Sequence, residues 1–325
     1  MTADHLHITS PPAFRIEQIR NLNQLSSVKP LLLAEMQKRD KIIELIIPDH
    51  EREVDNIFHK SYGEIFCAFD KDKPAGALIL RNLPVESSIY GMKIAMVRLL
   101  FTVREGTESK EIKKELLNHI LLFSKTQGIR YILYAGGSPD TIETEPLQTT
   151  GFEHLAQMVN LRRQSGELTA APPPSGVNIR SMGSGDISAI ADIAAESFIH
   201  DRYNADPFLP SDKTREIHGE WARKCCNFCH HVFVAVKQNR PVGFSAVTLP
   251  DKFSPSPVIQ LIAVAPAHQQ NGIGKSLLQK SLRQCQPPAQ VVLVRTEAKN
   301  LPAMNLYQSA GFKIYSSFYY FRKIV

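Results

Sequence analysis

The fold is decided by residues 259–278, IQLIAVAPAHQQNGIGKSLL, which divide into three parts. Residues 259–264 are a largely apolar run, rich in Ile, Leu and Val, with the length of a strand. Pro266 follows in a polar segment and ends that strand, because proline cannot continue a sheet ladder. After Gly272, apolar residues share one helical face: Ile273, Leu277, Leu278 and Leu282. The stretch therefore predicts a strand, a tight glycine loop and a helix.

The loop between this strand and helix reads QQNGIG over residues 269–274. Its glycines leave no side chain where a ligand would touch the backbone. The first N–H groups of a helix have no partner within the helix, and this end of the helix dipole is positive. Such a loop favours a pyrophosphate. The alternative is an ordinary glycine loop before a helix.

Single positions exclude two other phosphate loops. The P-loop motif needs glycine at position 269, where this chain has Gln, and the dinucleotide fingerprint needs a third glycine after Gly272 and Gly274. The remaining pattern, Q/R-x-x-G-x-G/A, resembles the acetyl-CoA loop of the GNAT superfamily of N-acetyltransferases. The resemblance implies acetyl-CoA as cosubstrate, bound by Gln269, Gln270, Asn271, Gly272, Ile273, Gly274, Lys275 and Ser276.

Length and composition limit the class of protein. A chain of 325 residues exceeds a usual single core, which favours two domains. We expect a cytoplasmic protein: five cysteines suggest reduced thiols, and we find neither a signal peptide nor an apolar run of membrane-spanning length. The net charge of +6 is spread along the chain, which suits polyanionic small ligands and gives no basic stripe for nucleic acid.

The second half of the chain repeats landmarks of the first half, in the same order. These are a first strand, a hairpin and a Gly-Phe pair: Ile16 and Ile179, Phe66 and Phe233, and Gly151-Phe152 and Gly311-Phe312. Between the halves, residues 165–176 (SGELTAAPPPSG) form a stiff proline-rich linker. The sequence predicts a tandem duplication with domains 1–164 and 177–325.

The second half resembles a GNAT domain over its whole length, because residues 296–312 also match the family's N-x-x-A-x-x-L-Y-x-x-x-G-F ending. The resemblance implies a mixed α/β fold of two tandem units, each a mixed, mostly antiparallel sheet flanked by helices. It implies that Asn300 and Ala303 contact the cofactor and that Tyr307 faces its sulfur. Backbone groups of the preceding strand would bind the thioester and the pantetheine amides, at Ile262, Ala263 and Val264.

Tyr307 is the candidate general acid, since the departing thiolate needs a proton. The alternative is a tyrosine that only packs beneath its helix. The base is left open: many relatives place Glu where this chain has Gln260, and an amide cannot take a proton. Other titratable residues lie in the substrate-side segment, where surface or capping roles are usual: Glu196, His200, Asp201 and Asp206. A water chain to solvent is the remaining route.

The acceptor site is expected in residues 198–210, FIHDRYNADPFLP, and the helix that carries Trp221. The run R-Y-x-x-D-P-x-L-P resembles the dTDP-fucosamine acetyltransferase group, although the first half is longer here. Arg202 would pair with a diphosphate and Tyr203 and Phe208 would stack on a base or sugar, with Asp206 in the same site. The alternative is an ordinary proline-containing loop before an anchored helix.

Two segments lack the residues that their possible roles require. In the first half, residues 104–109 carry one glycine and two acids, and Leu147 stands in place of Tyr307, so this unit is expected to be degenerate. The alternative is that it binds a ligand of its own.

Cys226 and Cys229 have zinc-like spacing beside two histidines, but no second pair stands at zinc-finger distance, so we expect no metal.

These features predict direct acetyl transfer in a ternary complex, from acetyl-CoA to a primary amine of a nucleotide-linked 4-amino-6-deoxy sugar. Other small-molecule acceptors stay open: an amino acid, an antibiotic, or a cysteinyl pseudo-disaccharide as in mycothiol synthase, which also pairs two such units. A non-catalytic acyl-CoA-binding interaction protein is the alternative from another class. The protein is expected to be a monomer or a homodimer.

Overall fold

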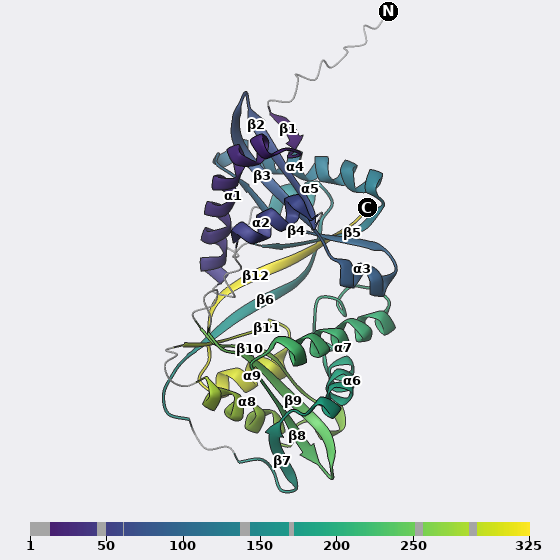
Figure 1. The fold of residues 1–325 in the computed structure, drawn as a ribbon, viewed down its shortest axis with the longest axis vertical. Helices are drawn as coiled ribbons and strands as arrows, with labels where there is room; N and C mark the ends of the chain where they lie inside the picture. Colours follow the sequence, from purple (N-terminus) through teal and green to yellow (C-terminus); the bar gives the residue numbers. More distant parts are fainter. Residues whose placement is uncertain are drawn as a thin grey trace, which may run out of the picture.

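The structure of the chain is a computed structural model, and it describes residues 14–43, 50–60, 62–136, 144–168, 172–250, 256–285 and 291–325. The molecule is elongated, with the first unit at one end and the second unit at the other (Figure 1). No helix in the described ranges is long and apolar enough to cross a membrane.

The first unit alternates strands and helices along the chain. Its elements are β1 (Arg15–Gln18), α1 (Leu22–Ile43), α2 (His50–His59), β2 (Gly63–Asp70), β3 (Lys73–Asn82), α3 (Pro84–Tyr90), β4 (Lys93–Thr102), α4 (Gly106–Gln127), β5 (Ile129–Gly136), α5 (Thr144–Thr149) and β6 (Glu153–Gln164).

The second unit follows the same order without a counterpart of α3. Its main elements are β7 (Val177–Ser181), α6 (Ile187–Ser197), α7 (Ser211–Phe228), β8 (His231–Lys237), β9 (Arg240–Thr248), β10 (Val258–Val264), α8 (Ile273–Gln284), β11 (Val291–Glu297), α9 (Leu301–Ser309) and β12 (Lys313–Ile324). The shared order confirms the predicted mixed α/β fold of two tandem units.

The strands of both units form one 12-stranded sheet, in the order β1-β2-β3-β4-β5-β12-β6-β11-β10-β9-β8-β7. The two units exchange their last strands: β12 pairs with β5 of the first unit, and β6 pairs with β11 of the second. Both strands cross the middle of the molecule side by side (Figure 1). The exchange joins the two expected sheets into one, and it leaves neither unit with an unpaired inner edge.

The predicted strand, loop and helix are all present in the second unit. The apolar face of α8 is buried against the sheet through Ile273, Leu277, Leu278 and Leu282. In the first unit, α4 buries an equivalent stripe of Ile112, Leu116, Leu117 and Ile120. In each unit the spacing of apolar residues explains why this helix covers the sheet.

The described end of the linker lies against the start of α8. The Ser276 hydroxyl donates a hydrogen bond to the Pro172 carbonyl at 3.1 Å, and the Pro174 carbonyl accepts one from the Val177 amide at 3.0 Å. This segment therefore borders the glycine loop. The domain boundaries at residues 164 and 177 stay a prediction.

Candidate active site

Strands β10 and β11 are parallel neighbours at one end and part at the other. Their pairing covers only Val258 and Ile259 of β10. In contrast, β10 stays paired with β9 as far as Val264, with Gln260 outside the register as a bulge. Beyond Ile259, no strand among the described residues pairs with the edge of β10 that faces β11. Its backbone groups can therefore bind an extended ligand.

A cavity of about 400 Å³ lies where the two strands part. Its walls come from both strands, from the segment between α6 and α7, and from α7, α9, β6 and β12. The lining residues are Met158, Phe198, His200, Asp201, Arg202, Trp221, Val258, Ile259, Gln260, Leu261, Ile262, Arg295, Thr296, Glu297, Asn300, Ala303, Tyr307 and Tyr320. The chain thus gathers segments far apart in sequence around one small-molecule-sized space.

The glycine loop has the backbone conformation that its sequence predicts. Gly272, the residue before α8, has φ +78°, and Gln270 has φ +59°, both in the left-handed region. The Asn271 side chain donates to the Gln269 carbonyl at 3.0 Å and so closes the turn. The first backbone bond of the helix runs from the Ser276 amide to the Gly272 carbonyl at 3.1 Å.

The amide N–H groups of residues 270–275 have no hydrogen-bond partner in the described chain, and no side chain caps α8. Gln269, Gln270, Asn271, Gly272 and Lys275 are exposed. The side chains of Ile273 and Ser276 are buried, so Ile273 can offer a ligand only its backbone amide, and the Ser276 amide is already bonded to the Gly272 carbonyl. A row of free donors at the positive end of a helix fits a pyrophosphate.

The three cofactor residues predicted on β10 differ in what they can offer. Ile262 lines the cavity, whereas the side chain of Ala263 is buried in the core on the other side. The Val264 carbonyl already accepts hydrogen bonds from Ser197 Oγ at 3.0 Å and Gln269 Nε2 at 2.9 Å. A cofactor amide at Val264 would therefore share or displace one of these donors.

Helix α9 brings the second predicted group of residues to the cavity. Asn300 caps the helix, and its Oδ1 accepts the Ala303 amide at 3.2 Å; both residues line the cavity. Tyr307 is only 4% exposed, and its ring packs edge-on against Phe312 at 5.7 Å. Burial, and then the charge of Glu297, raise the pKa of the Tyr307 phenol, which therefore keeps its proton at neutral pH.

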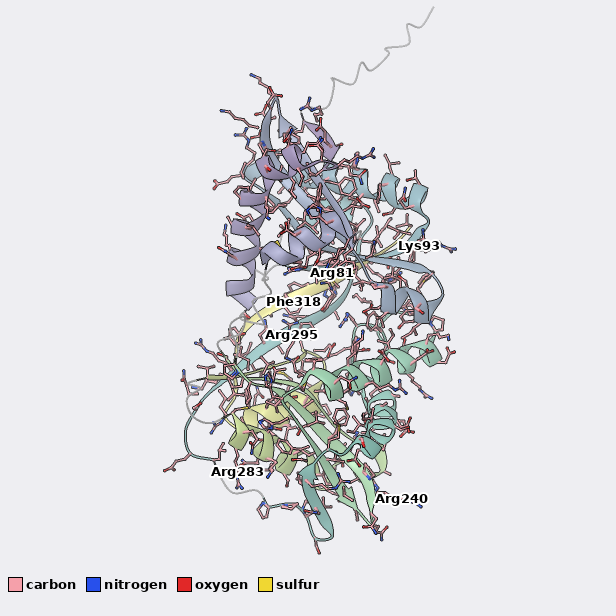
Figure 2. The ribbon with its side chains drawn as sticks, viewed as in Figure 1. Arg81, Lys93, Arg240, Arg283, Arg295 and Phe318 are labelled. Carbon is pink, nitrogen blue, oxygen red and sulfur yellow. The ribbon has the colours of Figure 1, made fainter. Side chains whose placement is uncertain are left out.

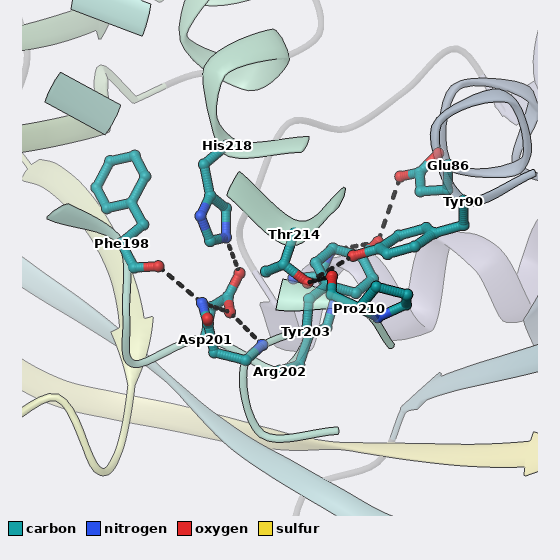
Figure 3. Close-up of polar contacts among 10 residues, drawn as sticks. Glu86, Tyr90, Phe198, Asp201, Arg202, Tyr203, Pro210, Thr214 and His218 are labelled. Carbon is teal, nitrogen blue, oxygen red and sulfur yellow. Dashed lines mark hydrogen bonds and ion pairs between the residues drawn. The ribbon is translucent and has the colours of Figure 1, made fainter. Parts of the chain in front are cut away.

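Arg202 reaches the cavity from the segment between α6 and α7 (Figure 3). Its guanidinium lies over three aromatic rings, with centroids at 4.4 Å for Tyr203, 4.6 Å for Tyr320 and 5.1 Å for Trp221. These contacts hold a buried cation in a fixed position. Of the four predicted acceptor residues, Arg202 alone is among the residues that line the cavity.

The other three predicted acceptor residues attach this segment to the first unit. Tyr203 is 1% exposed, and its hydroxyl donates to Glu86 of α3 at 3.3 Å (Figure 3). Asp206 is 2% exposed and accepts the Tyr131 hydroxyl of β5 at 2.6 Å. Phe208 stacks on the same Tyr131 ring at 6.0 Å. Their side chains position the segment rather than face the cavity.

Residues 189–312, which include the loop, the parted strands and α9, match the family model described as Acetyltransferase (GNAT) family. This part of the chain is therefore similar to the GNAT acetyltransferase family. The chain is also similar to the spore coat polysaccharide biosynthesis protein SpsD of Bacillus subtilis (strain 168). The two are 28% identical over an alignment of 235 residues, and the match covers 66% of this chain and 79% of SpsD.

Solved structures show the same fold over both units. A GCN5-related N-acetyltransferase from Sphaerobacter thermophilus has a TM-score of 0.62 at 14% identity, with 97% of each chain covered. A tandem GNAT protein from the clavulanic acid biosynthesis pathway has a TM-score of 0.64 at 13% identity, with 96% of this chain and 98% of that chain covered. The predicted fold of two tandem units is thereby confirmed.

The sequence predicted no role for Glu297, which ends β11 in the wall of the cavity. It is 9% exposed, and burial raises the pKa of its carboxyl group although the charge of Arg202 opposes the shift. A carboxyl group with a raised pKa is suited to take a proton near neutral pH. The sequence offered one signal for this role, because Glu297 stands at the end of a strand, three residues before Asn300.

Asp201 is held by a buried histidine instead of facing an acceptor freely. Its Oδ2 lies 2.5 Å from His218 Nε2, and its Oδ1 accepts the Asn204 amide at 2.8 Å (Figure 3). Burial raises the pKa of Asp201, but the hydrogen bond and charge of His218 outweigh it, so the net shift is downward. Glu196 is exposed on α6, and Gln260 donates to Thr248 at 3.0 Å. Glu297 is thus the best placed carboxyl group.

The corresponding part of the first unit is occupied by ion pairs. Arg104 lies 2.7 Å from Asp70 and 3.6 Å from Glu108, at the start of α4. Leu147, at the position that matches Tyr307, is 1% exposed in the core. These contacts put carboxylates where an incoming pyrophosphate would need donors. The degenerate role of the first unit stays a prediction.

The cysteine segment packs against the core of the second unit. Cys225 is 6% exposed, and Cys226 and Cys229 are partly buried against the same cluster. Across the described ranges, no group of three or more His, Cys, Asp or Glu side chains is arranged to hold a metal ion. The absence of a bound metal stays a prediction.

Proposed function

We propose that the second unit transfers the acetyl group of acetyl-CoA directly to a primary amine in a ternary complex. The observation that carries the proposal is one continuous path. It runs from the free amide donors of the glycine loop, along the unpaired edge of β10, to a cavity with Tyr307 and Glu297 in its wall. The loop suits a pyrophosphate, the edge suits a chain of amides, and the cavity suits the reacting groups.

Acetyl-CoA supplies an activated thioester, and the chain supplies position and charge. The backbone of residues 270–275 would hold the pyrophosphate, and Ile262, Ala263 and Val264 would align the pantetheine amides. Asn300 already uses its Oδ1 as a helix cap, which leaves its amide donors for the cofactor. N–H groups on the free edge of β10 would stabilise the oxyanion that forms when the amine attacks.

Two buried groups would move the protons. Glu297, whose pKa burial raises, would take a proton from the acceptor's ammonium group and so leave the neutral amine that attacks. Tyr307, whose pKa burial also raises, would donate its proton to the departing CoA thiolate. The amine nitrogen forms a bond to the acyl carbon and the carbon–sulfur bond breaks. The second proton that the nitrogen loses restores the Tyr307 phenol, and the products are an amide and free CoA thiol.

For the acceptor we propose the amine of a nucleotide-linked 4-amino-6-deoxy sugar. The similarity to a polysaccharide biosynthesis protein supports a sugar acceptor. The R-Y-x-x-D-P-x-L-P segment supports it as well, because one face of that segment supplies Arg202 to the cavity. This acceptor is small enough for its sugar and phosphates to enter the cavity while its nucleoside lies outside.

Thiol release from acetyl-CoA tests the proposal directly. The panel should contain dTDP- and UDP-linked 4-amino-6-deoxy sugars, amino acids and aminoglycosides, with each acetylated product identified by mass spectrometry. We expect turnover with a nucleotide-linked amino sugar. Thiol release with amino acids alone would contradict the sugar assignment, and release with no amine would contradict the transferase activity.

A further inference from the structure

Two arginines from different elements share the cavity. Arg202 lies between α6 and α7, and Arg295 lies on β11, two residues before Glu297. Figure 2 shows Arg295 beside Phe318, where β6 and β12 cross between the units. We call Arg202 and Arg295 the arginine pair. Sequence analysis assigned no role to Arg295.

Most N–H donors of the arginine pair have no acceptor in the part of the protein that the structure describes. A guanidinium group carries five N–H donors. Arg202 donates one hydrogen bond, from Nη2 to the Tyr203 hydroxyl at 3.3 Å, and its Nε is buried without a partner. Arg295 donates from Nε to Asn160 Oδ1 at 3.0 Å. Within the described ranges no ion pair joins either guanidinium to a carboxylate.

Aromatic rings hold both guanidinium groups in place without neutralising them. Tyr320 lies 4.6 Å from Arg202, and Phe318 lies 4.7 Å from Arg295. The two rings are neighbours on one face of β12, with centroids 5.4 Å apart. A ring face stabilises a cation but accepts none of its in-plane hydrogen bonds. The N–H edges of the pair therefore remain available to a ligand.

The two positive charges also act on each other. Burial lowers the pKa of Arg295, and the charge of Arg202 lowers it further. Burying two like charges close together is costly, and the charges of Glu297 and Asp201 act against that cost. An anion that enters the cavity removes this cost and satisfies the free donors.

We propose that the arginine pair is a phosphoryl-binding subsite for the acetyl acceptor, with both guanidinium groups on its phosphate or diphosphate. Two guanidinium groups suit a ligand with several oxygens and two negative charges, such as a phosphate or diphosphate. One carboxylate would fill the donors of only one guanidinium group. Arg295 and Glu297 are two residues apart on one strand, so they share a face of β11. The acceptor would place its anion at Arg295 and its amine toward Glu297.

The strand exchange builds this subsite. Asn160, which orients Arg295, lies on β6 of the first unit, and the rings beneath the pair lie on β12. β6 pairs with β11 beside Arg295, at Arg295↔Asn160. The first unit therefore contributes directly to how the second unit recognises its acceptor. The proposal rests on the proposed function for the identity of its ligand as the acceptor.

The test is a titration of dTDP, UDP, sugar monophosphate and inorganic phosphate, with acetate as the carboxylate probe. Each is titrated calorimetrically into protein saturated with desulfo-CoA, which blocks the cofactor's own pyrophosphate site. We expect the phosphoryl probes to bind, and Arg202→Gln and Arg295→Gln each to raise Kd by about 10- to 100-fold. Arg240→Gln, at the exposed start of β9, is the matched control and should change nothing.

Desulfo-CoA affinity and thermal unfolding show whether each variant is folded. Unchanged Kd values in folded variants, or binding of acetate alone, would overturn the phosphoryl subsite. Binding of nucleoside diphosphates without monophosphates assigns the ligand to a nucleotide-linked acceptor, and the reverse assigns it to a sugar phosphate. Arginine-dependent phosphoryl binding in a protein that acetylates no amine would support the subsite and contradict the proposed function.

Discussion

The hydroxyl of Tyr131 on β5 donates a 2.6 Å hydrogen bond to Asp206, which belongs to the second unit. Both side chains are buried, and Arg322 of β12 lies 3.3 Å from the same carboxylate oxygen. The first unit therefore holds the segment that carries Arg202 into the cavity. This gives the first unit a mechanical role that needs no ligand of its own.

Tyr131→Phe should weaken both stability and acceptor binding. The change removes one donor from a buried carboxylate, which costs about 1–2 kcal/mol in the free energy of unfolding. The acceptor KM should rise, while the acetyl-CoA KM stays unchanged, because the glycine loop is not touched. Denaturant unfolding and steady-state kinetics measure these effects, with the exposed Tyr62→Phe as control. Equal changes in both KM values would contradict a role specific to the acceptor segment.

The sequence predicted the parts of the site that local rules determine. The glycine loop depends on the left-handed φ of Gly272, and the α9 start depends on the Asn300 cap, so both motifs are visible within a few residues. Tyr307 reaches the cavity because its place on α9 follows from the same motif. These local backbone conformations are the same however the remaining strands are arranged.

Long-range pairing could not be predicted in the same way. β6 and β12 are both 12-residue strands, and nothing in their own patterns says which unit each will join. The exchange decides that Tyr320 lies under Arg202 and that Asn160 orients Arg295. The exchange also brings Asp206 into contact with Tyr131. Asp206, which was expected to bind the acceptor, therefore holds its segment against the first unit instead.

Gly272→Val should abolish acetyl-CoA binding, because a β-branched residue at φ +78° distorts the loop backbone. Gly106→Val is the matched control: Gly106 has φ +61° at the start of α4 in the first unit. Gly106→Val should introduce a similar backbone strain and leave acetyl-CoA binding unchanged. Calorimetry on the unmodified protein should give one acetyl-CoA per chain. Two equal sites, or loss of binding in Gly106→Val, would show that the first unit also binds cofactor.

Glu297→Gln should lower kcat/KM by roughly a hundredfold or more, because the amide cannot take the amine's proton. In the unmodified protein, the pKa of the acid limb of the pH–rate profile should lie above the usual range for a Glu carboxyl group, since burial raises the pKa of Glu297. The variant should lose that limb. The exposed Glu196→Gln is the control. A variant that keeps both its rate and its acid limb would exclude Glu297 as the base.

The same substitution should have the opposite effect on stability. The folded protein holds the Glu297 proton more tightly than the unfolded chain does, so Glu297 costs stability as pH rises from its unfolded pKa to its folded pKa. Glu297→Gln should therefore stabilise the protein at pH 8 and have little effect at pH 4. Thermal unfolding across this range tests the sign. A variant destabilised at pH 8 would show that the ionised carboxylate is favourably paired.

Tyr307→Phe should reduce turnover while leaving the fold and the cofactor site unchanged. The substitution removes one hydroxyl, keeps the ring against Phe312 and leaves no described hydrogen bond broken. Loss of proton donation to the thiolate costs on the order of a hundredfold or more in the chemical step. The loss should appear in kcat and not in the acetyl-CoA KM, since the phenol acts when the carbon–sulfur bond breaks.

Product release can hide a slower chemical step, so single-turnover rates are the proper measurement for Tyr307→Phe. Tyr319→Phe, on the exchanged strand but outside the cavity wall, controls for loss of a hydroxyl elsewhere. Because burial raises the pKa of Tyr307, no alkaline loss of rate from this phenol should appear near neutral pH. If Tyr307→Phe matched the unmodified protein in single turnover, the tyrosine would be a packing residue and water would protonate the thiolate.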